Sequence, residues 1–291
     1  MNKNTKILVC CHKKDVVVNT PPYYPIHVGK VLSNVDLGIT GDDIGLNISE
    51  KNSSYCELTG LYWAWRNMTQ TEIVGLCHYR RYFDFHNQCK RVLPQQTFPA
   101  EIIERLDFSV PESVLNNVEN GVVYVANPII YPYPLKIDYC ERHYSEDFRI
   151  MEHIVKQTQP ENVKRAFYDV MVCENRMFPC NMFLMKWSDF IDYCTWLFDL
   201  LETIEKATDI SNYSTLQKRI YGFMAERLFN VWLRANKKKT ICEPVIMLNN
   251  DPKRIKETTV ARYWLKKQMW TLSNMLMRKM PYETWSSEPA T

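Results

Sequence analysis

The chain has 291 residues, of which 46% are hydrophobic and 24% charged, so it can bury a core and is not intrinsically disordered. Eight Gly and 15 Pro exclude collagen-like and low-complexity classes, and a net charge of +3 is too small to indicate nucleic-acid binding. Aromatic residues make up 13% of the chain, which fits either a large aromatic core or an aromatic-lined ligand site.

Strands alternate with helices along the chain, an order that predicts an α/β fold with a mostly parallel central sheet flanked by helices. In chain order we expect a strand at 6–11, loops at 19–30 and 41–57, a helix at 57–67, a strand that begins 72–83, a Pro-rich loop at 94–99, helices near 100–106 and 111–118, a strand at 121–128, mostly helix over 136–175, a strand and then a long helix within 181–207, a helix at 215–234 and a strand at 242–248. We expect residues 1–250 to form one domain and 251–291 a basic, aromatic, helical tail.

No apolar run reaches the ~18 residues needed to cross a bilayer, and the run near the N-terminus is too short for a signal-peptide core. None of the 10 cysteines forms a Cys-x-x-Cys pair, so neither a zinc site nor a disulfide scaffold is indicated. We therefore expect a cytoplasmic protein. Neither GxGxxG nor GxxxxGK[ST] occurs, which argues against a Rossmann fingerprint and a P-loop.

Polar residues follow two of the expected buried strands. Because ligands bind at the carboxyl ends of strands in open α/β sheets, we expect these residues to contact a ligand. Guanidinium groups bind phosphate in a bidentate manner and Tyr rings stack on sugars or bases, which favours a nucleotide. The candidates are Cys11, His12 and Lys13 after the first strand and His78, Tyr79, Arg80 and Arg81, within HYRRY, after the second. Strand alternation puts Arg80 and Arg81 on opposite faces, and a solvated edge strand is the alternative.

The loop at 41–57 is rich in acids and amides. Asp42 and Asp43, with Asn47 and Asn52, could hold a divalent cation or accept hydrogen bonds from sugar hydroxyls. The alternative is a turn followed by a helix cap, since Asp and Asn favour both. The Asp-x-Asp motif of metal-dependent nucleotide-sugar transferases is absent from the candidate strand ends, so no metal ligand is assigned. Cationic side chains could replace the metal at a leaving diphosphate, although Mn²⁺ or Mg²⁺ stays possible.

Further polar pairs stand in apolar or helical surroundings. Glu226 and Arg227 lie inside an apolar helix, where charges are costly unless they are paired or functional. Glu226 is therefore a candidate general base, and a buried ion pair is the alternative. Asn181 and Met182 begin an apolar strand, and His143 and Tyr144 lie in a polar helical stretch. We expect these four residues and Arg227 to contact the sugar or the acceptor, against a structural role for each.

The tail is basic and aromatic. Residues 253–280 contain eight Lys or Arg and one acid, Glu257. Such a segment could lie on an anionic bilayer, with Trp and Leu inserted, and a terminal helix packed on the domain is the alternative.

The chain resembles the bacterial family catalogued as domain of unknown function 4422 over roughly residues 5–250. The blocks that carry the resemblance are ILVCCHKK, YYPIHVGK, GDDIGLNISEKNSSYCELTGLYWAWRN, GLCHYRRYF, NMFLMKWSDFIDYCTWLFDLLE and RIYGFMAERLFNVWL. The family is linked to capsule, O-antigen (lipopolysaccharide) and exopolysaccharide synthesis, and some members are assigned as galactofuranosyltransferases. The resemblance implies a GT-A-like nucleotide-sugar transferase fold.

The family's motifs fall on the candidate residues. HYRRY falls on His78 to Tyr82, GDD on Asp42 and Asp43, NMF on Asn181 to Phe183, ER on Glu226 and Arg227, and a His-Tyr pair on His143 and Tyr144. One departure is the segment VENGVVYVANP, since family members often carry an acid shortly before this apolar segment. The tail beyond about residue 255 lies outside the resemblance.

These observations predict a glycosyltransferase of the hexosyltransferase class. It would move a sugar, galactofuranose being one candidate, from a UDP-linked donor to a lipid-linked surface-polysaccharide acceptor at the cytoplasmic face of the inner membrane. Residues 251–280 would make the peripheral membrane contact, and nucleic acid is not an expected partner. The alternative is a glycan-binding or assembly module of the polysaccharide machinery without turnover. A hydrolase is less favoured, because no carboxylate pair with evident acid/base spacing occurs.

Overall fold

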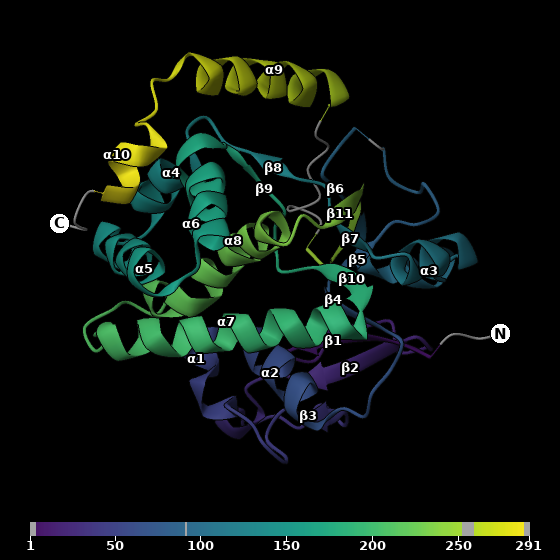
Figure 1. Ribbon diagram of the computed structural model, residues 1–291. Coiled ribbons are helices and arrows are strands. Elements are labelled where there is room, and N and C mark those ends of the chain that lie inside the picture. The colour runs from purple at the N-terminus through teal and green to yellow at the C-terminus, as the bar shows by residue number, and fades with distance from the viewer. Residues whose placement is uncertain (1–3, 91, 252–258, 288–291) are drawn as a thin grey trace.

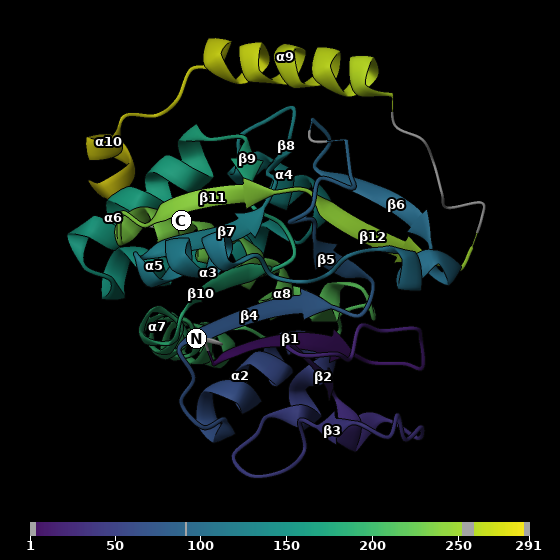
Figure 2. The ribbon, with the colours of Figure 1, turned by 90° about the vertical axis from the view of Figure 1, so that its right-hand side faces the viewer.

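The computed structural model describes residues 4–90, 92–251 and 259–287 of the chain. At its centre is a ten-stranded sheet whose main path has the order β11-β7-β10-β4-β1-β2-β3 (Figure 2). These strands are Lys239–Glu243, Val122–Ala126, Phe183–Lys186, Ile73–His78, Thr5–Cys11, Tyr23–His27 and Thr40–Gly41. Within this described path β10 runs antiparallel to both of its neighbours, and every other pair is parallel. The predicted mostly parallel sheet is confirmed.

Three further strands extend the sheet beyond the carboxyl end of β4. β5 (Arg81–Phe83) reverses against β4 by pairing Arg81 with His78. β12 (Val245–Asn249) pairs with β5, and β6 (Gln95–Pro99) pairs with β12. The reversal between β4 and β5 keeps the HYRRY segment at the end of the sheet. A separate two-stranded sheet consists of β8 (Ile129–Ile130) and β9 (Arg176–Met177).

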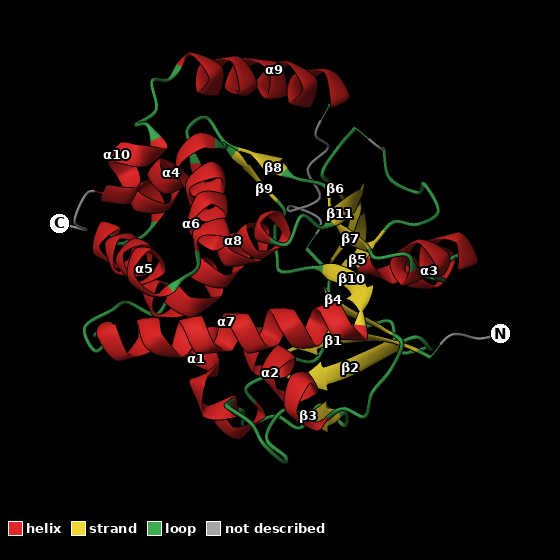
Figure 3. Ribbon diagram, viewed as in Figure 1, coloured by secondary structure: helices red, strands yellow, loops and turns green. Residues whose placement is uncertain are grey.

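Helices cover the sheet on both faces (Figures 1 and 3). The α-helices are α1 (Asn52–Tyr55), α2 (Leu58–Asn67), α3 (Glu112–Glu119), α4 (Leu135–Arg142), α5 (Ser145–Thr158), α6 (Glu161–Phe167), α7 (Trp187–Ala207), α8 (Ile220–Ala235), α9 (Val260–Leu276) and α10 (Tyr282–Ser287). Short 3-10 turns lie at Lys30–Leu32, Ser49–Lys51, Ala100–Arg105 and Gln217–Arg219, and a π-helical turn at Tyr168–Cys173.

The continuous apolar run of β1 reflects burial on both of its faces. Leu8 and Cys10 join the apolar cluster that contains α2, α7 and α8, whereas Ile7 and Val9 join the cluster that contains α3 and β12. Successive side chains of a strand point to opposite faces, so a strand between two helical layers needs apolar residues at every position.

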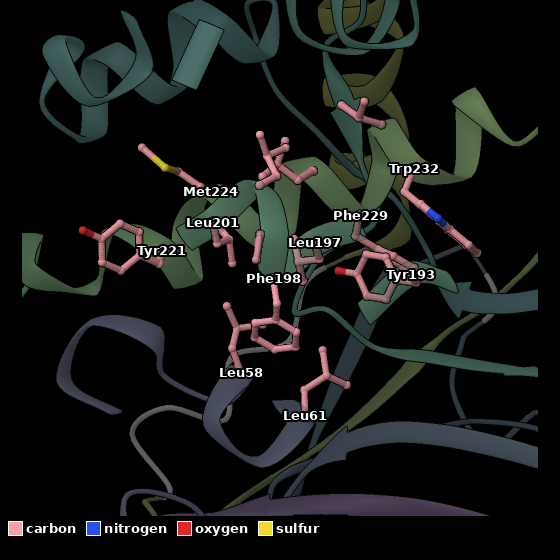
Figure 4. Packing of buried hydrophobic residues seen from close by; sticks show 14 of the residues in the cluster. Leu58, Leu61, Tyr193, Leu197, Phe198, Leu201, Tyr221, Met224, Phe229 and Trp232 are labelled. Carbon is pink, nitrogen blue, oxygen red and sulfur yellow. The ribbon is translucent and has the colours of Figure 1, made fainter. Parts of the chain in front are cut away.

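The larger cluster is organised around α7, which packs against both α2 and α8. Figure 4 shows Phe198 of α7 beside Leu58 of α2, and Phe229 of α8 in the same apolar cluster. Trp65 of α2 stacks on Phe198, with the ring centres 5.6 Å apart and the planes at 10°. The apolar sides of the two helices that we predicted at 57–67 and within 181–207 therefore face each other.

Two segments that we predicted to be loops contain strands, β2 within 19–30 and β6 within 94–99. Proline is compatible with β2 because β1 bonds to alternate residues of its parallel neighbour. The N–H of Val28 donates to the carbonyl of Cys11 (2.8 Å), which puts the N position of Pro25 on the side away from β1. The prolines of these two segments led us to predict loops, although both segments pair with neighbouring strands.

Other boundaries also differ from the prediction. The strand predicted at 242–248 is two strands, because Pro244 interrupts the chain between β11 and β12. The polar loop at 41–57 contains the short helix α1 and a 3-10 turn.

The residues beyond 250 fall into two described helices with different environments. No residue of α9 is buried, whereas Trp285 of α10 is 2% exposed and belongs to the same apolar cluster as α5 and α6. The indole N–H of Trp285 donates to Glu152 Oε1 (2.8 Å), and its ring stacks on Phe167. The domain boundary at residue 250 stays a prediction, and residues 252–258 lie outside the described residues. Over the described ranges, each helix is too short or too polar to cross a membrane.

We expect Trp285→Ala to lower the free energy of unfolding by about 3 kcal/mol, because it removes a buried indole and its hydrogen bond. Trp264→Ala is the matched control, since Trp264 is 55% exposed and its removal should change the stability by less than about 0.5 kcal/mol. Urea unfolding of the full chain measures both. Equal stabilities of the two variants would show that α10 does not support the core.

Candidate functional site

A pocket of about 540 Å³ opens at the carboxyl ends of β1 and β4, against α1 and the start of α8. The parallel register of the two strands pairs Cys10 with His78, so both strands end at the same edge of the sheet. That edge is where open α/β sheets bind ligands. The loops after the two strands bring His12 and Tyr79 to the wall of the pocket.

Tyr79 is surrounded by nitrogen groups. The His12 ring meets the Tyr79 ring edge-on at 5.1 Å, Lys13 Nζ lies 5.9 Å from the ring centre, and the Arg80 guanidinium carbon lies 5.2 Å from it. Burial, followed by the charge of Lys13, lowers the pKa of His12 from its usual value, so the imidazole is neutral at pH 7. An aromatic ring bordered by cations suits a planar base that carries phosphates.

Two carboxylates lie in another wall of the pocket. Asn181 Nδ2 donates to Glu57 Oε1 (2.8 Å), and the backbone N–H of Cys180 donates to Glu226 Oε1 (3.0 Å). Burial raises the pKa of Glu57, and the hydrogen bond from Asn181 opposes this only in part. Burial likewise raises the pKa of Glu226, against the charge of Arg227. A carboxylate with a raised pKa is a stronger proton acceptor than an ordinary surface glutamate.

His78 ties the end of β4 to the same wall. Its Nε2 lies 2.7 Å from the carbonyl oxygen of Cys180, so this nitrogen carries the proton and donates. Burial, followed by the charge of Arg81, lowers the pKa of His78 to about 4. The imidazole is therefore neutral at pH 7, and it acts as a fixed donor rather than as a cation.

The backbone around the pocket is strained. Cys56, Cys180 and Asn181 have φ values of 54°, 68° and 50°, a region that non-glycine residues rarely occupy. Such positions cost on the order of 1–3 kcal/mol each and cluster at functional sites. Cys56 and Cys180 line the pocket, and Asn181 holds Glu57. The strain is thus located at the residues that position both carboxylates.

Two arginines provide positive charge. Arg81 lines the pocket, and its buried Nε has no hydrogen-bond partner within the described residues. The Nε–H of Arg219 donates to Cys56 Sγ (3.2 Å), which holds this guanidinium at the rim. A buried guanidinium N–H without a partner is costly, and an anionic ligand in the pocket would balance the positive charge of both arginines.

The structure brings together a large part of the predicted site. The predicted residues that line the pocket are His12, Asn52, His78, Tyr79, Arg81 and Glu226. Asn181 reaches the pocket through Glu57, and Lys13 lies beside Tyr79. Their roles toward a ligand stay predictions.

Arg80 is already paired. Its Nε and Nη2 both donate to Asp15 Oδ2, at 2.9 Å and 2.7 Å, and Asp15 is almost fully buried. The two arginines do point to different surroundings, but the reason differs from the predicted strand alternation, because Arg80 lies in the turn between β4 and β5. Arg81 lines the pocket, and Arg80 pairs with the loop after β1.

Asp42 has the structural role that we gave as the alternative, because it stabilises a turn. Its carboxylate is fully buried and accepts hydrogen bonds from the N–H groups of Gly29 (2.8 Å) and Lys30 (3.1 Å) and from Ser49 Oγ (2.5 Å). Gly29 has a φ of 67°, which a side chain would disfavour. Asp42 thus closes the turn after β2 and is not among the residues that line the pocket.

The other acid and amide of this loop also lie apart from the pocket lining. Asp43 packs next to Gly41, and Asn47 Nδ2 donates to the carbonyl of Gly45 (3.0 Å). Among the described residues, no group of three or more His, Cys, Asp or Glu is placed to hold a metal ion. The alternative that this loop holds a divalent cation therefore gains no support from the described residues.

Cys11 and Met182 lie in the apolar cluster on the opposite face of the sheet from the pocket. Because side chains alternate along β1, the neighbouring Cys10 lines the pocket instead.

Three further predicted residues are not among those that line the pocket. Arg227 is buried, pairs with Asp138 at 3.6 Å and donates to the carbonyl of Phe223 (2.9 Å). His143 stacks on Phe223, with the ring centres 4.1 Å apart, and Phe223 itself lines the pocket. Tyr144 is exposed and meets Tyr213 edge-on. These positions fit the alternative that the three residues have structural roles and do not contact the sugar or the acceptor.

Glu57, Arg219 and Phe223 were missed by the sequence analysis. Glu57 directly precedes the apolar stripe of α2, a place where a glutamate is typical of an ordinary helix start. Its partner Asn181 is 124 residues away along the chain, so no local pattern could connect them. Phe223 lies in α8 and Arg219 in the 3-10 turn directly before it, where apolar periodicity was the signal that the sequence offered.

The chain belongs to the family described as domain of unknown function DUF4422, whose model matches residues 6–238. The solved structure titled WbbM bifunctional glycosyltransferase, in its apo form, is similar to this chain with a TM-score of 0.77 and 29% sequence identity. The similarity covers 85% of this chain and 46% of the other, so the chain spans about half the length of that protein. None of the curated proteins matches this chain. The family resemblance and the GT-A-like fold are thereby confirmed.

We expect Glu57→Gln to stabilise the protein at neutral pH, because the amide oxygen still accepts from Asn181 and no buried charge remains. A carboxyl with a raised pKa stays protonated to higher pH in the folded state than in the unfolded state. The wild type therefore loses stability as the pH rises above about 4.5 and through the raised pKa, and the variant lacks this loss.

Urea unfolding of both proteins between pH 4 and 8 measures the difference. Glu202→Gln is the control, since Glu202 is exposed on α7. If Glu57→Gln were less stable than the wild type across the whole range, Glu57 would be a structural anchor rather than a strained site residue.

Proposed function

We propose that this protein is a glycosyltransferase of the hexosyltransferase class, which transfers a sugar from a UDP-linked donor. The observation that carries the proposal is the pocket at the ends of β1 and β4, which combines two arginines with two partly buried carboxylates. The 29% identity to a structure titled as a glycosyltransferase supports the same reaction class. The transfer needs both kinds of group close together, because the anionic donor requires positive charge and the acceptor hydroxyl requires a carboxylate that takes its proton.

The donor enters with its diphosphate toward Arg81 and Arg219. The guanidinium groups of Arg81, which lines the pocket, and of Arg219 supply charged hydrogen bonds to the phosphate oxygens as negative charge develops on them. The base lies against Tyr79, beside the neutral His12 ring. Arg81 and Arg219 thus take the role that a divalent cation has in metal-dependent transferases.

Glu226 is the proposed general base of an inverting reaction. It accepts the proton of the acceptor hydroxyl as that oxygen bonds to the anomeric carbon and the bond from this carbon to the diphosphate breaks. The diphosphate keeps the electron pair and leaves as UDP. Glu57 and Asn181, held to each other at 2.8 Å, bind hydroxyl groups of the transferred sugar. A retaining reaction would not require the base.

The acceptor in this proposal is a lipid-linked surface-polysaccharide intermediate, as in capsule, exopolysaccharide or lipopolysaccharide synthesis, and galactofuranose is the first sugar to test. Such an acceptor brings the enzyme to the cytoplasmic face of the inner membrane. The proposed contact is made by residues 251–280, of which 252–258 lie outside the described residues. The small net charge of the chain, +3, gives no reason to include a nucleic acid.

We expect Arg81→Lys and Arg219→Lys each to weaken UDP binding roughly tenfold to hundredfold, because a lysine keeps the charge but loses the forked hydrogen bonds. Calorimetry with UDP and a panel of UDP-sugars measures the affinities. Arg149→Lys, on the exposed side of α5, is the control and should bind as the wild type does. Addition of Mn²⁺ or of a chelator should change the affinity less than about twofold.

Two outcomes would contradict the proposal. A folded protein that binds none of these nucleotides would favour the glycan-binding module. Binding that requires Mn²⁺ would show that a cation, rather than the two arginines, carries the diphosphate.

We expect Glu226→Gln to lower the rate of sugar transfer by about 10²–10⁴-fold while UDP affinity changes little, because the amide cannot accept the proton. The UDP released from the donor that binds in the calorimetric panel gives the rate, with Glu202→Gln as the control. An unchanged rate in Glu226→Gln would assign the base to Glu57 or indicate a retaining reaction.

A further inference from the structure

Helix α9 turns its apolar side away from the protein. Its large apolar side chains are between 55% and 77% exposed. They are Trp264, Leu265, Met269, Leu272, Met275 and Leu276. At 100° per residue these positions fall within one arc of roughly 140°, so they form a single apolar face, which contains one polar residue, the exposed Gln268. We call this set the outer face of α9.

The opposite side of α9 is attached to the protein by polar contacts. Asn274 Nδ2 donates to the carbonyl of Cys173 (3.0 Å), and Ser273 Oγ donates to the carbonyl of Pro132 (3.4 Å). Asn175 Nδ2 donates to the carbonyl of Trp270 (3.0 Å). Figures 1 and 2 show α9 at the outside of the molecule, running above β8 and β9. A helix that served to complete the core would bury its apolar side, so this orientation requires another apolar environment.

Positive charge borders the outer face. On the helical projection Arg262 and Lys266 lie along one edge of the apolar arc and Lys267 lies beyond the other. Over the described residues 259–287 there are five Lys or Arg, the remaining two being Arg278 and Lys279, against one acid, Glu283. A second copy of the chain on this face would bring the same cations together, which opposes self-association.

We propose that α9 lies in the interfacial layer of a bilayer that contains anionic phospholipid, with the outer face in the acyl region and the bordering cations among the headgroups. Amphipathic helices with Trp and Leu on one side and Lys and Arg on the other bind such surfaces. Trp285 of α10, buried beside Phe167, fixes the chain that follows α9 to the domain. The membrane therefore holds the whole domain and not a free tail. This inference deepens the proposed membrane contact of the transferase.

The test is flotation of the full chain with vesicles of equal parts phosphatidylglycerol and phosphatidylcholine, and with vesicles of phosphatidylcholine alone. The wild type should float with the first and far less with the second, and added salt should release part of it. The double variant Trp264→Glu, Leu272→Glu should lose binding more than tenfold. Lys266→Gln with Lys267→Gln should lower the partition coefficient roughly thirtyfold, about fivefold per lysine.

The matched control is Val31→Glu with Val35→Glu, which adds the same charge at two apolar residues of similar exposure, 58% and 55%, on another surface. It should bind vesicles nearly as the wild type does, apart from a small loss from the added negative charge. Circular dichroism confirms that each variant is folded, since the outer face contributes nothing to the core.

Vesicle binding that survives the Trp264→Glu, Leu272→Glu change would overturn the inference. So would a wild type that ignores anionic vesicles and sediments as a dimer that the same change dissociates, because the occupant would then be a second copy. UDP affinity, measured on the same variants, should equal that of the wild type. A loss of vesicle binding with intact UDP binding separates this inference from the proposed transferase activity.

Discussion

Burial of β1 and β4 on both faces is the constraint on which the rest of the structure depends. With helices on each side of the sheet, neither strand can carry a polar side chain along its length without leaving that group unsatisfied. Polar chemistry is therefore confined to the ends of the strands. The parallel pairing of Cys10 with His78 then places both ends at one edge, where His12, Tyr79 and Arg81 meet.

The turn at Cys180 and Asn181 connects this edge to the carboxylates. The backbone N–H of Cys180 donates to Glu226 of α8, and its carbonyl accepts a hydrogen bond from His78 of β4. The side chain of Asn181 donates to Glu57. Three elements far apart in sequence thus share one strained turn. Strain and buried carboxylates both lower stability, and they persist at this place because the large aromatic cluster around α7 stabilises the domain as a whole.

Much of the fold could be predicted from the sequence, because periodicity reports which faces are buried. The apolar run of β1 and the stripes of α2 and α7 were such signals, whereas the prolines in β2 and β6 suggested loops. For the site, residue type identified the HYRRY segment, but the reversal between β4 and β5, which separates Arg81 from Arg80, could not be predicted from the sequence. Alternation could not, however, say which of Cys10 and Cys11 faces the pocket, since both faces of β1 are apolar. Glu57 could not be identified as a site residue, because what sets it apart is a hydrogen bond from Asn181, which is far away along the chain.

Helix α9 differs from the other helices, because its main apolar side is exposed rather than buried. The large apolar residues of the outer face are exposed, whereas the inner side of α9, which includes the partly buried Tyr263 and Trp270, forms hydrogen bonds with Cys173, Pro132 and Asn175. Nothing in the apolar pattern of 260–276 distinguishes a helix packed on the domain from one that faces outward, because both need one apolar side. The contacts of the inner side, which the structure shows, decide between them. They leave the cations and the apolar outer face together on one surface, which is the combination that an anionic bilayer binds.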